Sequence, residues 1–282
     1  MSIVRPPIHL SRVVALALDE DLGRGDVTTD SCVPDDVQGH CAFRARTPLV
    51  TAGSEIIQEV FLQIDRRVVV SEVVPDGSAL TAGSVIALVR GPASSILKGE
   101  RVALNFVQRL SGTATLTREY VQALPTGSRT RIVDTRKTTP GLRALERLAV
   151  RAGGGYNHRE DLSSAVLIKD NHIAAAGGVQ SAILRCREYA PHTSRIECEV
   201  DSLAQLEEAL SARADIVLLD NFDDAMVAQA VQINRGRAIL EASGNITILR
   251  VARLAELGVD VISVGALTHS APSADIGLDW ET

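Results

Sequence analysis

A repeated pattern in the second half of the chain constrains the fold more than any other feature. From about residue 128 onward, short β-rich runs that end in polar residues alternate with amphipathic helical stretches. The runs are residues 131–137, 165–172, 195–201, 215–221, 238–245 and 260–266. Two of the helical stretches are residues 202–212 and residues 246–258, the second closed by Gly258. Because strands that alternate with helices form a parallel sheet, an α/β fold is predicted.

Two α/β architectures fit such units, a doubly wound open sheet and a β/α barrel. Every run ends in reactive or small residues. In a barrel the carboxyl ends of all strands face one mouth, where the active site lies. We therefore favour the barrel, which would be incomplete because the six runs are fewer than the eight strands of a full barrel.

The first part of the chain has a different pattern and predicts a smaller α+β domain. A helix is expected near residues 9–22, and strand candidates separated by glycine-containing turns lie at residues 39–46, 67–74 and 84–91. A long helix is expected at residues 93–124, with Gly112 as a site for a kink. The expected domains are residues 1–115 and residues 116–282, and the C-terminal tail could join the first.

Composition narrows the class of protein. The chain has 282 residues and four scattered cysteines without a C-x-x-C pair, which disfavours a disulfide framework and a zinc knuckle. No secretory signal and no membrane-spanning run is recognised, so a cytoplasmic protein without a membrane partner is expected. A net charge of −6 and 3% aromatic residues disfavour nucleic acid as a partner. An acidic protein can still steer a small anion into a local cationic pocket.

Acidic side chains are expected at the ends of neighbouring strands. In "RIECEVD", alternation places Glu197 and Glu199 inside the barrel, and Asp220 ends the next run. Carboxylates on adjacent strands suit a divalent cation, with Mg²⁺ the natural candidate. The alternative is structural ion pairing with the basic residues nearby.

Basic side chains gather at other strand ends. Arg136 and Lys137 close one run, His158 and Arg159 lie in the loop before the next, and Lys169 closes that next run. Arginine grips a planar carboxylate with two hydrogen bonds, while lysine serves phosphate as a point charge. The residues therefore suit a ligand that carries both groups.

Small residues follow several runs. "ASGN" (242–245) and "VGAL" (264–267) end the last two, where main-chain N–H groups can cradle a phosphate. "GGG" (153–155) is interpreted as a helix terminus and a flexible link, and Pro140 is expected in the first turn of a helix. No serine-elbow, P-loop, H-E-x-x-H or dinucleotide-binding motif is present. An anion pocket without an activated nucleophile indicates that the substrate itself attacks.

Nine segments, in order along nearly the whole chain, closely resemble the quinolinate phosphoribosyltransferase family, also called carboxylating nicotinate-nucleotide pyrophosphorylases. They are "DEDLGRGDVTTD" (19–30), "GERVALNFVQRLSGTAT" (99–115), "DTRKTTPGLR" (134–143), "GGGYNHR" (153–159), "LIKDNH" (167–172), "ECEVDS" (197–202), "LLDN" (218–221), "EASGNI" (241–246) and "VGALTHS" (264–270). The resemblance implies an N-terminal α/β sandwich and an incomplete α/β barrel. It also implies a homodimer or a dimer-based hexamer in which Arg101 serves the neighbouring subunit's site.

The implied reaction joins quinolinate to phosphoribosyl pyrophosphate with Mg²⁺, giving nicotinate mononucleotide, pyrophosphate and CO₂ in de novo NAD biosynthesis. The resemblance assigns the quinolinate carboxylates to Arg101, Arg136, His158 and Arg159. It assigns Lys137 and Lys169 to the pyrophosphate end and the substrate junction, and Glu199 and Asp220 to the metal and ribose. The 5′-phosphate region would comprise Ser243, Gly244, Asn245, Gly265, Ala266 and His269. The sequence departs from the family at Thr113, often aliphatic, and at Asn245, commonly glycine.

Three alternatives remain open from the sequence. The first is a paralogous phosphoribosyltransferase with another acceptor, such as nicotinate. The second is a barrel lyase in which Lys169 forms a Schiff base, its neutral amine favoured by neighbouring cations. The third is a non-catalytic anion-binding module.

Overall fold

The structure, a computed structural model, describes residues 9–281 and divides the chain into two compact units. The first unit comprises the described residues up to Arg118, Thr138–Gly154 and the segment from Leu267 onward. The second comprises Glu119–Lys137 and Gly155–Ala266. No helix within residues 9–281 is long and apolar enough to cross a membrane.

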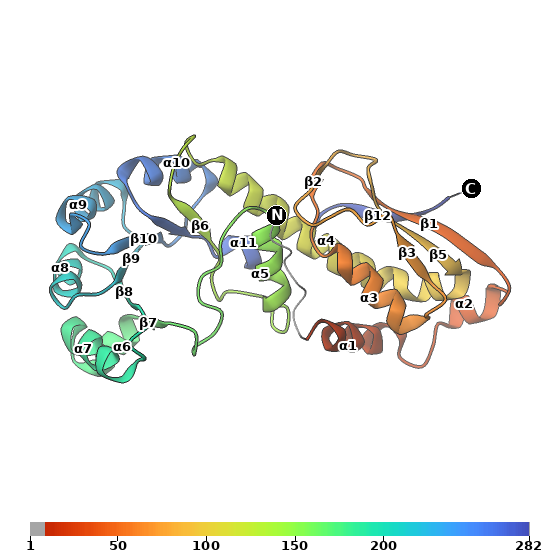
Figure 1. The fold of residues 1–282 in the computed structure, drawn as a ribbon, viewed down its shortest axis with the longest axis horizontal. Helices are drawn as coiled ribbons and strands as arrows, with labels where there is room; N and C mark the ends of the chain where they lie inside the picture. Colours follow the sequence, from red (N-terminus) through yellow and green to blue (C-terminus); the bar gives the residue numbers. More distant parts are fainter. Residues whose placement is uncertain (1–8, 282) are drawn as a thin grey trace. The chain divides into compact units, whose positions relative to one another are not determined.

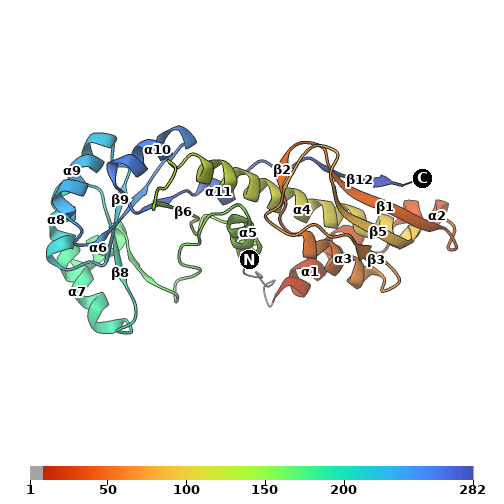
Figure 2. The same cartoon turned by 45° about the horizontal axis from the view of Figure 1, so that its top comes forward.

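The first unit is built on an antiparallel sheet in the order β12-β1-β5-β3 (Figure 2). Its strands are β1 (Gln38–Ala45), β3 (Val69–Ser71), β5 (Val85–Pro92) and β12 (Ile276–Trp280), and β2 (Leu49–Val50) pairs separately with β4 (Ala79–Leu80). Its helices are α1 (Leu10–Leu22), α2 (Val27–Cys32), α3 (Ser54–Ile64), most of α4 (Ala93–Gln122), α5 (Arg143–Ala152) and the end of α11 (Ala266–His269). The expected helix 9–22, the expected strands 39–46 and 84–91 and the long helix are therefore confirmed, and the expected strand 67–74 contains only the short β3.

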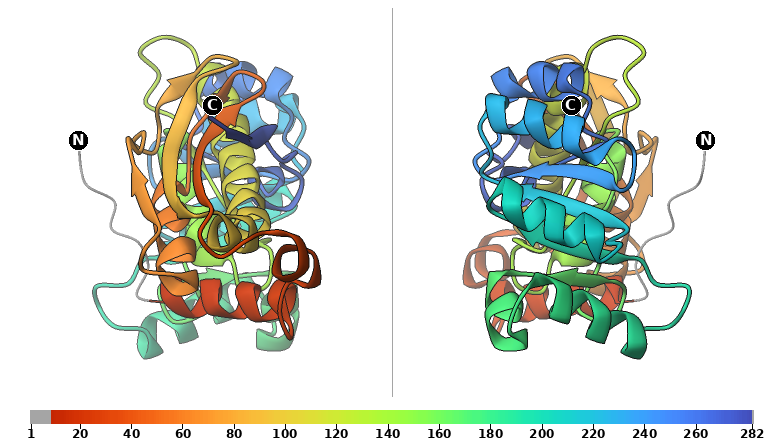
Figure 3. Two further views of the ribbon diagram at one scale, coloured as in Figure 1. Left: turned by 90° about the vertical axis from the view of Figure 1, so that its right-hand side faces the viewer. Right: turned by 90° about the vertical axis from the view of Figure 1, so that its left-hand side faces the viewer.

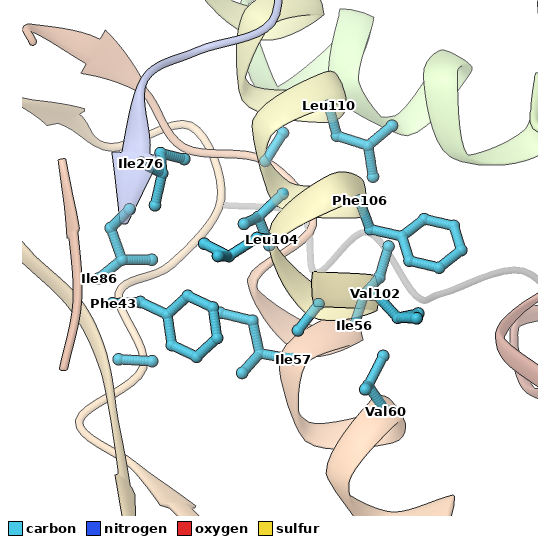
Figure 4. Packing of buried hydrophobic residues seen from close by; sticks show 14 of the residues in the cluster. Phe43, Ile56, Ile57, Val60, Ile86, Val102, Leu104, Phe106, Leu110 and Ile276 are labelled. Atoms are coloured by element: carbon cyan, nitrogen blue, oxygen red, sulfur yellow. The ribbon is translucent and has the colours of Figure 1, made fainter. Parts of the chain in front are cut away.

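Sequence reasoning missed α3 because its start follows a glycine turn. Gly53 is the N-cap of the helix with φ 85°, so the glycine-containing segment at residues 51–55 indicates only a turn. The helix nevertheless presents an apolar face, and Ile57, Val60 and Phe61 are fully buried. Figure 4 shows α3 and α4 facing the strands, with Phe43, Ile86 and Ile276 on the strand side of the core.

Two features explain why the first unit takes in segments beyond residue 115. Leu145 and Ala149 of α5 belong to its buried core, and β12 pairs antiparallel with β1. The C-terminal tail thus joins the first unit. Gly112 lies within α4, one continuous helix, and a Cβ there would stand 1.9 Å from the Pro272 carbonyl oxygen. Close approach of the chain, rather than a kink, explains this glycine.

The second unit is a six-stranded sheet in the order β6-β11-β10-β9-β8-β7, and every pair in it is parallel. Its strands are β6 (Arg131–Val133), β7 (Val166–Ile168), β8 (Ile196–Val200), β9 (Ile216–Asp220), β10 (Ile239–Ser243) and β11 (Val261–Ser263). The helices between them are α6 (Asp170–Ala176), α7 (Val179–Tyr189), α8 (Leu203–Ser211), α9 (Asp224–Asn234) and α10 (Ile248–Leu257). All six predicted runs thus contain a strand of one sheet.

Strand order distinguishes the two architectures that the sequence left open. Strands β7 to β11 are neighbours in chain order, without the reversal that defines a doubly wound sheet. The connecting helices α7 to α10 lie in an arc on one side of the strands (Figures 1 and 3). A sheet of sequential parallel strands covered on one face by its helices is an incomplete α/β barrel.

The strands end earlier than the β-rich runs. β6 stops at Val133, so Arg136 and Lys137 lie in the loop after it rather than on the strand. The expectation for Pro140 was wrong, because α5 begins only at Arg143. Leu142 N donates to Thr139 O at 3.0 Å, which makes Pro140 and Gly141 the central pair of a turn.

Candidate active site

Strand register in the second unit brings the predicted acids to one face of the sheet. Glu199 pairs with Leu218 across β8 and β9, and Asp220 lies two residues beyond Leu218. Because side chains alternate along a strand, Glu199 and Asp220 share a face. Ser243 pairs with Asp220 across β9 and β10, which extends this face to the next strand.

A pair of arginines forms the cationic part of the site. The Nε atoms of Arg136 and Arg159 are both buried, and neither has a hydrogen-bond partner among the described residues. Burial, followed by the charge of Arg136, lowers the pKa of the Arg159 guanidinium. Two half-buried arginines whose buried Nε–H donors are unused suit the binding of an anion.

The loop that carries Arg159 is tied to the end of β6. Tyr156 forms a parallel β-bridge with Val133, so the chain continues the sheet for one residue beyond β6. Asp134, fully buried, accepts hydrogen bonds from Asn157 Nδ2 at 2.6 Å and from His158 N at 2.7 Å. "GGGYNHR" is therefore an anchored loop after Gly155, and Asp134 fixes the position of the two predicted site residues that follow.

His158 contacts protein groups through both ring nitrogens. Its Nδ1 accepts the main-chain N–H of Arg159 at 2.7 Å. Its Nε2 lies 3.3 Å from Glu197 Oε2 and 3.5 Å from Glu241 Oε1. Burial alone would lower the pKa of His158. The hydrogen bond to Glu197 and the charges of the nearby carboxylates outweigh burial, so the pKa lies above its ordinary value.

The two carboxylates that face His158 are themselves buried, with side chains 5% exposed for Glu197 and 4% for Glu241. Burial and then the charge of Glu197 raise the pKa of Glu241 to about 7. Glu241 Oε1 accepts no hydrogen bond from any part of the chain that the structure describes. Near neutral pH, the two carboxyl groups together therefore favour one negative charge over two.

Lys169 and Glu199 form an ion pair on the same side of the sheet. The Lys169 ammonium donates to Glu199 Oε2 at 2.9 Å, and the lysine remains half exposed while the glutamate is mostly covered. Lys169 directly follows β7 and is the N-cap of α6, where its main-chain N–H donates to His172 Nδ1 at 2.9 Å. This ion pair engages the charged form of the lysine, which argues against a Schiff-base lyase.

The loops after β9 and β10 interlock through Asn221. Asn221 N donates to Ser243 O at 3.0 Å, and Asn245 Nδ2 donates to Asn221 Oδ1 at 3.2 Å. A Cβ at Gly244 would stand 2.2 Å from Asn221 Oδ1, so only glycine fits there. Asn245 has φ 49°, a left-handed conformation that asparagine tolerates better than most residues. This explains how asparagine occupies a position where glycine is common.

The remaining predicted residues fall outside these contacts. Lys137 is exposed in the loop after β6, where its main-chain N–H donates to Thr135 Oγ1 at 3.1 Å. Gly265 and Ala266 stand between β11 and the body of α11 in the second unit. Arg101, exposed on α4, and His269, exposed at the end of α11, belong to the first unit.

Sequence reasoning missed three residues that shape the site: Asp134, Glu241 and Asn221. Glu241 could have been found, because it lies two residues before Ser243 and alternation turns both to the same face. Asp134 carried no such pattern, since its role depends on a loop more than 20 residues away along the chain. The role of Asn221 likewise depends on a contact between two loops.

These features define an α/β-barrel enzyme that binds anionic substrates at the carboxyl ends of its strands. Comparison with known proteins gives the family. The model of the quinolinate phosphoribosyl transferase C-terminal domain matches residues 113–279, and that of the N-terminal domain matches residues 26–111. The chain therefore belongs to the quinolinate phosphoribosyltransferase family.

Individual relatives cover nearly the full length. The chain is 44% identical over 260 residues to a probable nicotinate-nucleotide pyrophosphorylase [carboxylating] of Bacillus subtilis, covering 92% of the chain and 89% of that protein. It is 44% identical to the nicotinate-nucleotide pyrophosphorylase [carboxylating] of Mycobacterium leprae, with 93% and 94% covered. The crystal structure of NadC from Streptococcus pyogenes superposes with a TM-score of 0.93 at 42% identity, covering 100% of both chains.

Proposed function

We propose that this protein transfers the phosphoribosyl group of phosphoribosyl pyrophosphate to quinolinate and releases pyrophosphate and CO₂, forming nicotinate mononucleotide for NAD biosynthesis. The observation that carries the assignment is the pair of half-buried arginines Arg136 and Arg159, whose buried Nε atoms lack hydrogen-bond partners among the described residues. Their mutual repulsion is relieved by a bound anion, and quinolinate offers two adjacent carboxylates. A nicotinate acceptor offers only one.

The chemistry needs no base from the protein. The pyridine nitrogen of quinolinate attacks the anomeric carbon with its lone pair, and the bond from that carbon to pyrophosphate breaks. The nitrogen then carries a positive charge, and the ring accepts the electron pair of the adjacent carbon–carboxylate bond as CO₂ leaves. A proton from water completes the ring carbon. These reaction steps suit a site that has cations and carboxylates but no activated nucleophile.

The proposed roles of the charged residues follow from where charge develops. Lys137 stabilises the departing pyrophosphate, and Lys169 serves the junction between the two substrates. Glu199 and Asp220 face the ribose, whose oxocarbenium-like transition state is positive. The ion pair of Lys169 with Glu199 holds both side chains at that face of the sheet before substrates bind.

Mg²⁺ is the cofactor that the site would hold. Glu199 and Asp220 offer hard oxygen donors on one face of adjacent strands, and both side chains are partly accessible. Mg²⁺ commonly binds one or two carboxylates and completes its shell with water and substrate phosphates, so these two donors fit. The ion would offset negative charge on the pyrophosphate.

The 5′-phosphate is proposed to bind at the loops after the last strands. Ser243, Gly244 and Asn245 form one loop, in which two consecutive residues have positive φ. Gly265 and Ala266 form the start of the other, and His269 ends α11. Barrels often bind phosphate at these two loops.

We further propose a homodimer, or a hexamer of dimers, in which Arg101 contributes to the neighbouring subunit's site. An exposed arginine on α4 is compatible with this role. Mixing inactive Arg101→Ala protein with inactive Lys137→Ala protein should restore activity through mixed dimers. Absence of recovery after verified subunit exchange would contradict shared sites.

A single assay tests the function. Purified protein is incubated with phosphoribosyl pyrophosphate, Mg²⁺ and either quinolinate or nicotinate, and nicotinate mononucleotide and CO₂ are measured. We expect product and one equivalent of CO₂ from quinolinate. Product from nicotinate alone would overturn the proposal.

A further inference from the structure

His158 lies between the main chain of Arg159 and the two buried carboxylates of Glu197 and Glu241. Its Nε2 faces Glu197 and Glu241, while its Nδ1 accepts the main-chain N–H of Arg159. The side chain is only 14% exposed. Through its imidazole ring, His158 thus connects Arg159 to Glu197 on β8 and Glu241 on β10.

The hydrogen bond at Nδ1 determines the tautomer. A nitrogen that accepts an N–H at 2.7 Å presents a lone pair, so the proton of the neutral ring lies on Nε2. That N–H points toward the two carboxylates. The ligand atoms of these three residues lie within 4.8 Å of one another, as in a metal site, but a protonated Nε2 cannot coordinate a metal.

We propose that Glu197 and Glu241 are positioning residues for quinolinate, acting on Arg159 through His158. Glu197 shares a hydrogen bond with His158 Nε2, and the Glu241 carboxylate attracts the same Nε2–H from 3.5 Å. Together they set the ring so that Nδ1 fixes the Arg159 main chain. His158 in this view orients Arg159. The inference rests on the proposed function and names residues within its acceptor pocket.

The charge of Glu197 also acts on Arg159 directly. The negative charge of Glu197 stabilises the charged Arg159 guanidinium, opposing the effects of burial and of Arg136. Arg159 Nη1 also donates to Ala165 O at 3.2 Å, which leaves its buried Nε–H for a ligand. Main chain, side chain and charge of Arg159 are thus all set by protein groups before a substrate binds.

The first test compares two substitutions at Glu241. Glu241→Leu removes the carboxylate 3.5 Å from His158 Nε2 and should raise KM for quinolinate about tenfold, the effect of one lost charge-assisted contact, with KM for phosphoribosyl pyrophosphate unchanged. Glu241→Gln keeps an acceptor oxygen and should restore most of the quinolinate affinity. The matched control is Glu207→Gln, an exposed glutamate on α8, which should change neither constant. Equal loss of affinity for both substrates, or none for quinolinate, would overturn the proposal.

A double-mutant cycle tests whether the effect passes through Arg159. In an Arg159→Lys background, Glu241→Leu should raise KM for quinolinate less than twofold further, because the fork that it positions is gone. Additive effects of the two substitutions would show that Glu241 acts independently of Arg159 and would contradict the proposal.

A measurement on the unmodified protein covers the case in which Glu241→Leu fails to fold. Nitrogen-15 NMR of labelled histidine at pH 8 should show His158 with a protonated Nε2 and an unprotonated Nδ1; the opposite tautomer would overturn the inference. The two hypotheses fail differently. If the unmodified protein does not use quinolinate, the proposed function is wrong, whereas normal turnover with the opposite tautomer rejects only the positioning role.

Discussion

Each unit of the molecule contains half-buried arginine and buried glutamate, but the two sets form different hydrogen bonds. In the first unit, Glu146 has no exposed surface and accepts hydrogen bonds from Arg109, from Thr139 N and from Thr139 Oγ1. Arg109 also donates to the carbonyl oxygens of Thr268 and Ala271. In the second unit, Arg136 Nε, Arg159 Nε and Glu241 Oε1 are buried without a hydrogen-bond partner among residues 9–281, although Glu241 Oε1 lies 3.5 Å from His158 Nε2.

This difference separates a structural network from a binding site. Where each donor and acceptor is used internally, the charges hold two loops against a helix and offer nothing to a ligand. Where buried donors remain unused, the folded state retains a desolvation cost that a complementary anion removes. Among these arginine and glutamate side chains, burial and charge alone therefore do not distinguish a binding site from a structural network, whereas incomplete hydrogen bonding does.

The largest expected effect is on stability in the first unit. Arg109→Ala leaves the fully buried Glu146 without its cation, which should lower the free energy of unfolding by about 3–5 kcal/mol. Urea unfolding followed by circular dichroism measures this change. A loss below about 1 kcal/mol would mean that the network is not structural, and the contrast between the units would fail.

Arg136→Lys tests the other side of the comparison. Lysine keeps the charge but loses the planar fork, so KM for quinolinate should rise about 10- to 100-fold, while KM for phosphoribosyl pyrophosphate stays within about twofold. Stability should change by less than about 1 kcal/mol, because the Arg136 Nε–H makes no internal hydrogen bond among the described groups. Steady-state kinetics with each substrate varied in turn measures both KM values. An equal rise in KM for the two substrates would contradict the assignment of Arg136 to quinolinate.

The next effect depends on pH. The pKa of Glu241 is about 7 in the folded protein and near 4.5 when unfolded, so the folded state retains a proton that the unfolded chain releases. Stability should therefore fall as pH rises from about 4.5 to 7, by at most about 1.4 kcal/mol per pH unit, and level off above that range. Denaturant midpoints between pH 5 and 8 should show a flatter profile for Glu241→Gln. An unchanged slope in that variant would assign the effect to another group.

How far the sequence predicts this site depends on how local the cause is. Periodicity alone yields the parallel sheet, and alternation yields the shared face of Glu199 and Asp220. The end of β6 was misjudged because the polar residues that follow a strand still have β-rich neighbours, and the start of α5 was misjudged because Pro140 belongs to a turn before the helix. The Asp134 contacts and the Asn221 interlock join segments distant in sequence, and no one-dimensional pattern encodes which partner a buried polar group finds.

The smallest expected effect concerns Asn245. It lies in the proposed phosphate loop, but its side chain is hydrogen-bonded within the protein. Its left-handed φ costs about 1 kcal/mol, which glycine would relieve, but Asn245→Gly also loses the hydrogen bond to Asn221 Oδ1 and gains chain entropy in the unfolded state. These contributions oppose each other, so stability should change by less than about 0.5 kcal/mol, as measured by thermal unfolding. KM for phosphoribosyl pyrophosphate should change less than twofold, because the asparagine side chain is used within the protein. A rise above about fivefold would show that this side chain binds the phosphate directly, and Asn245 would then belong with the arginines whose bonds are completed by a ligand.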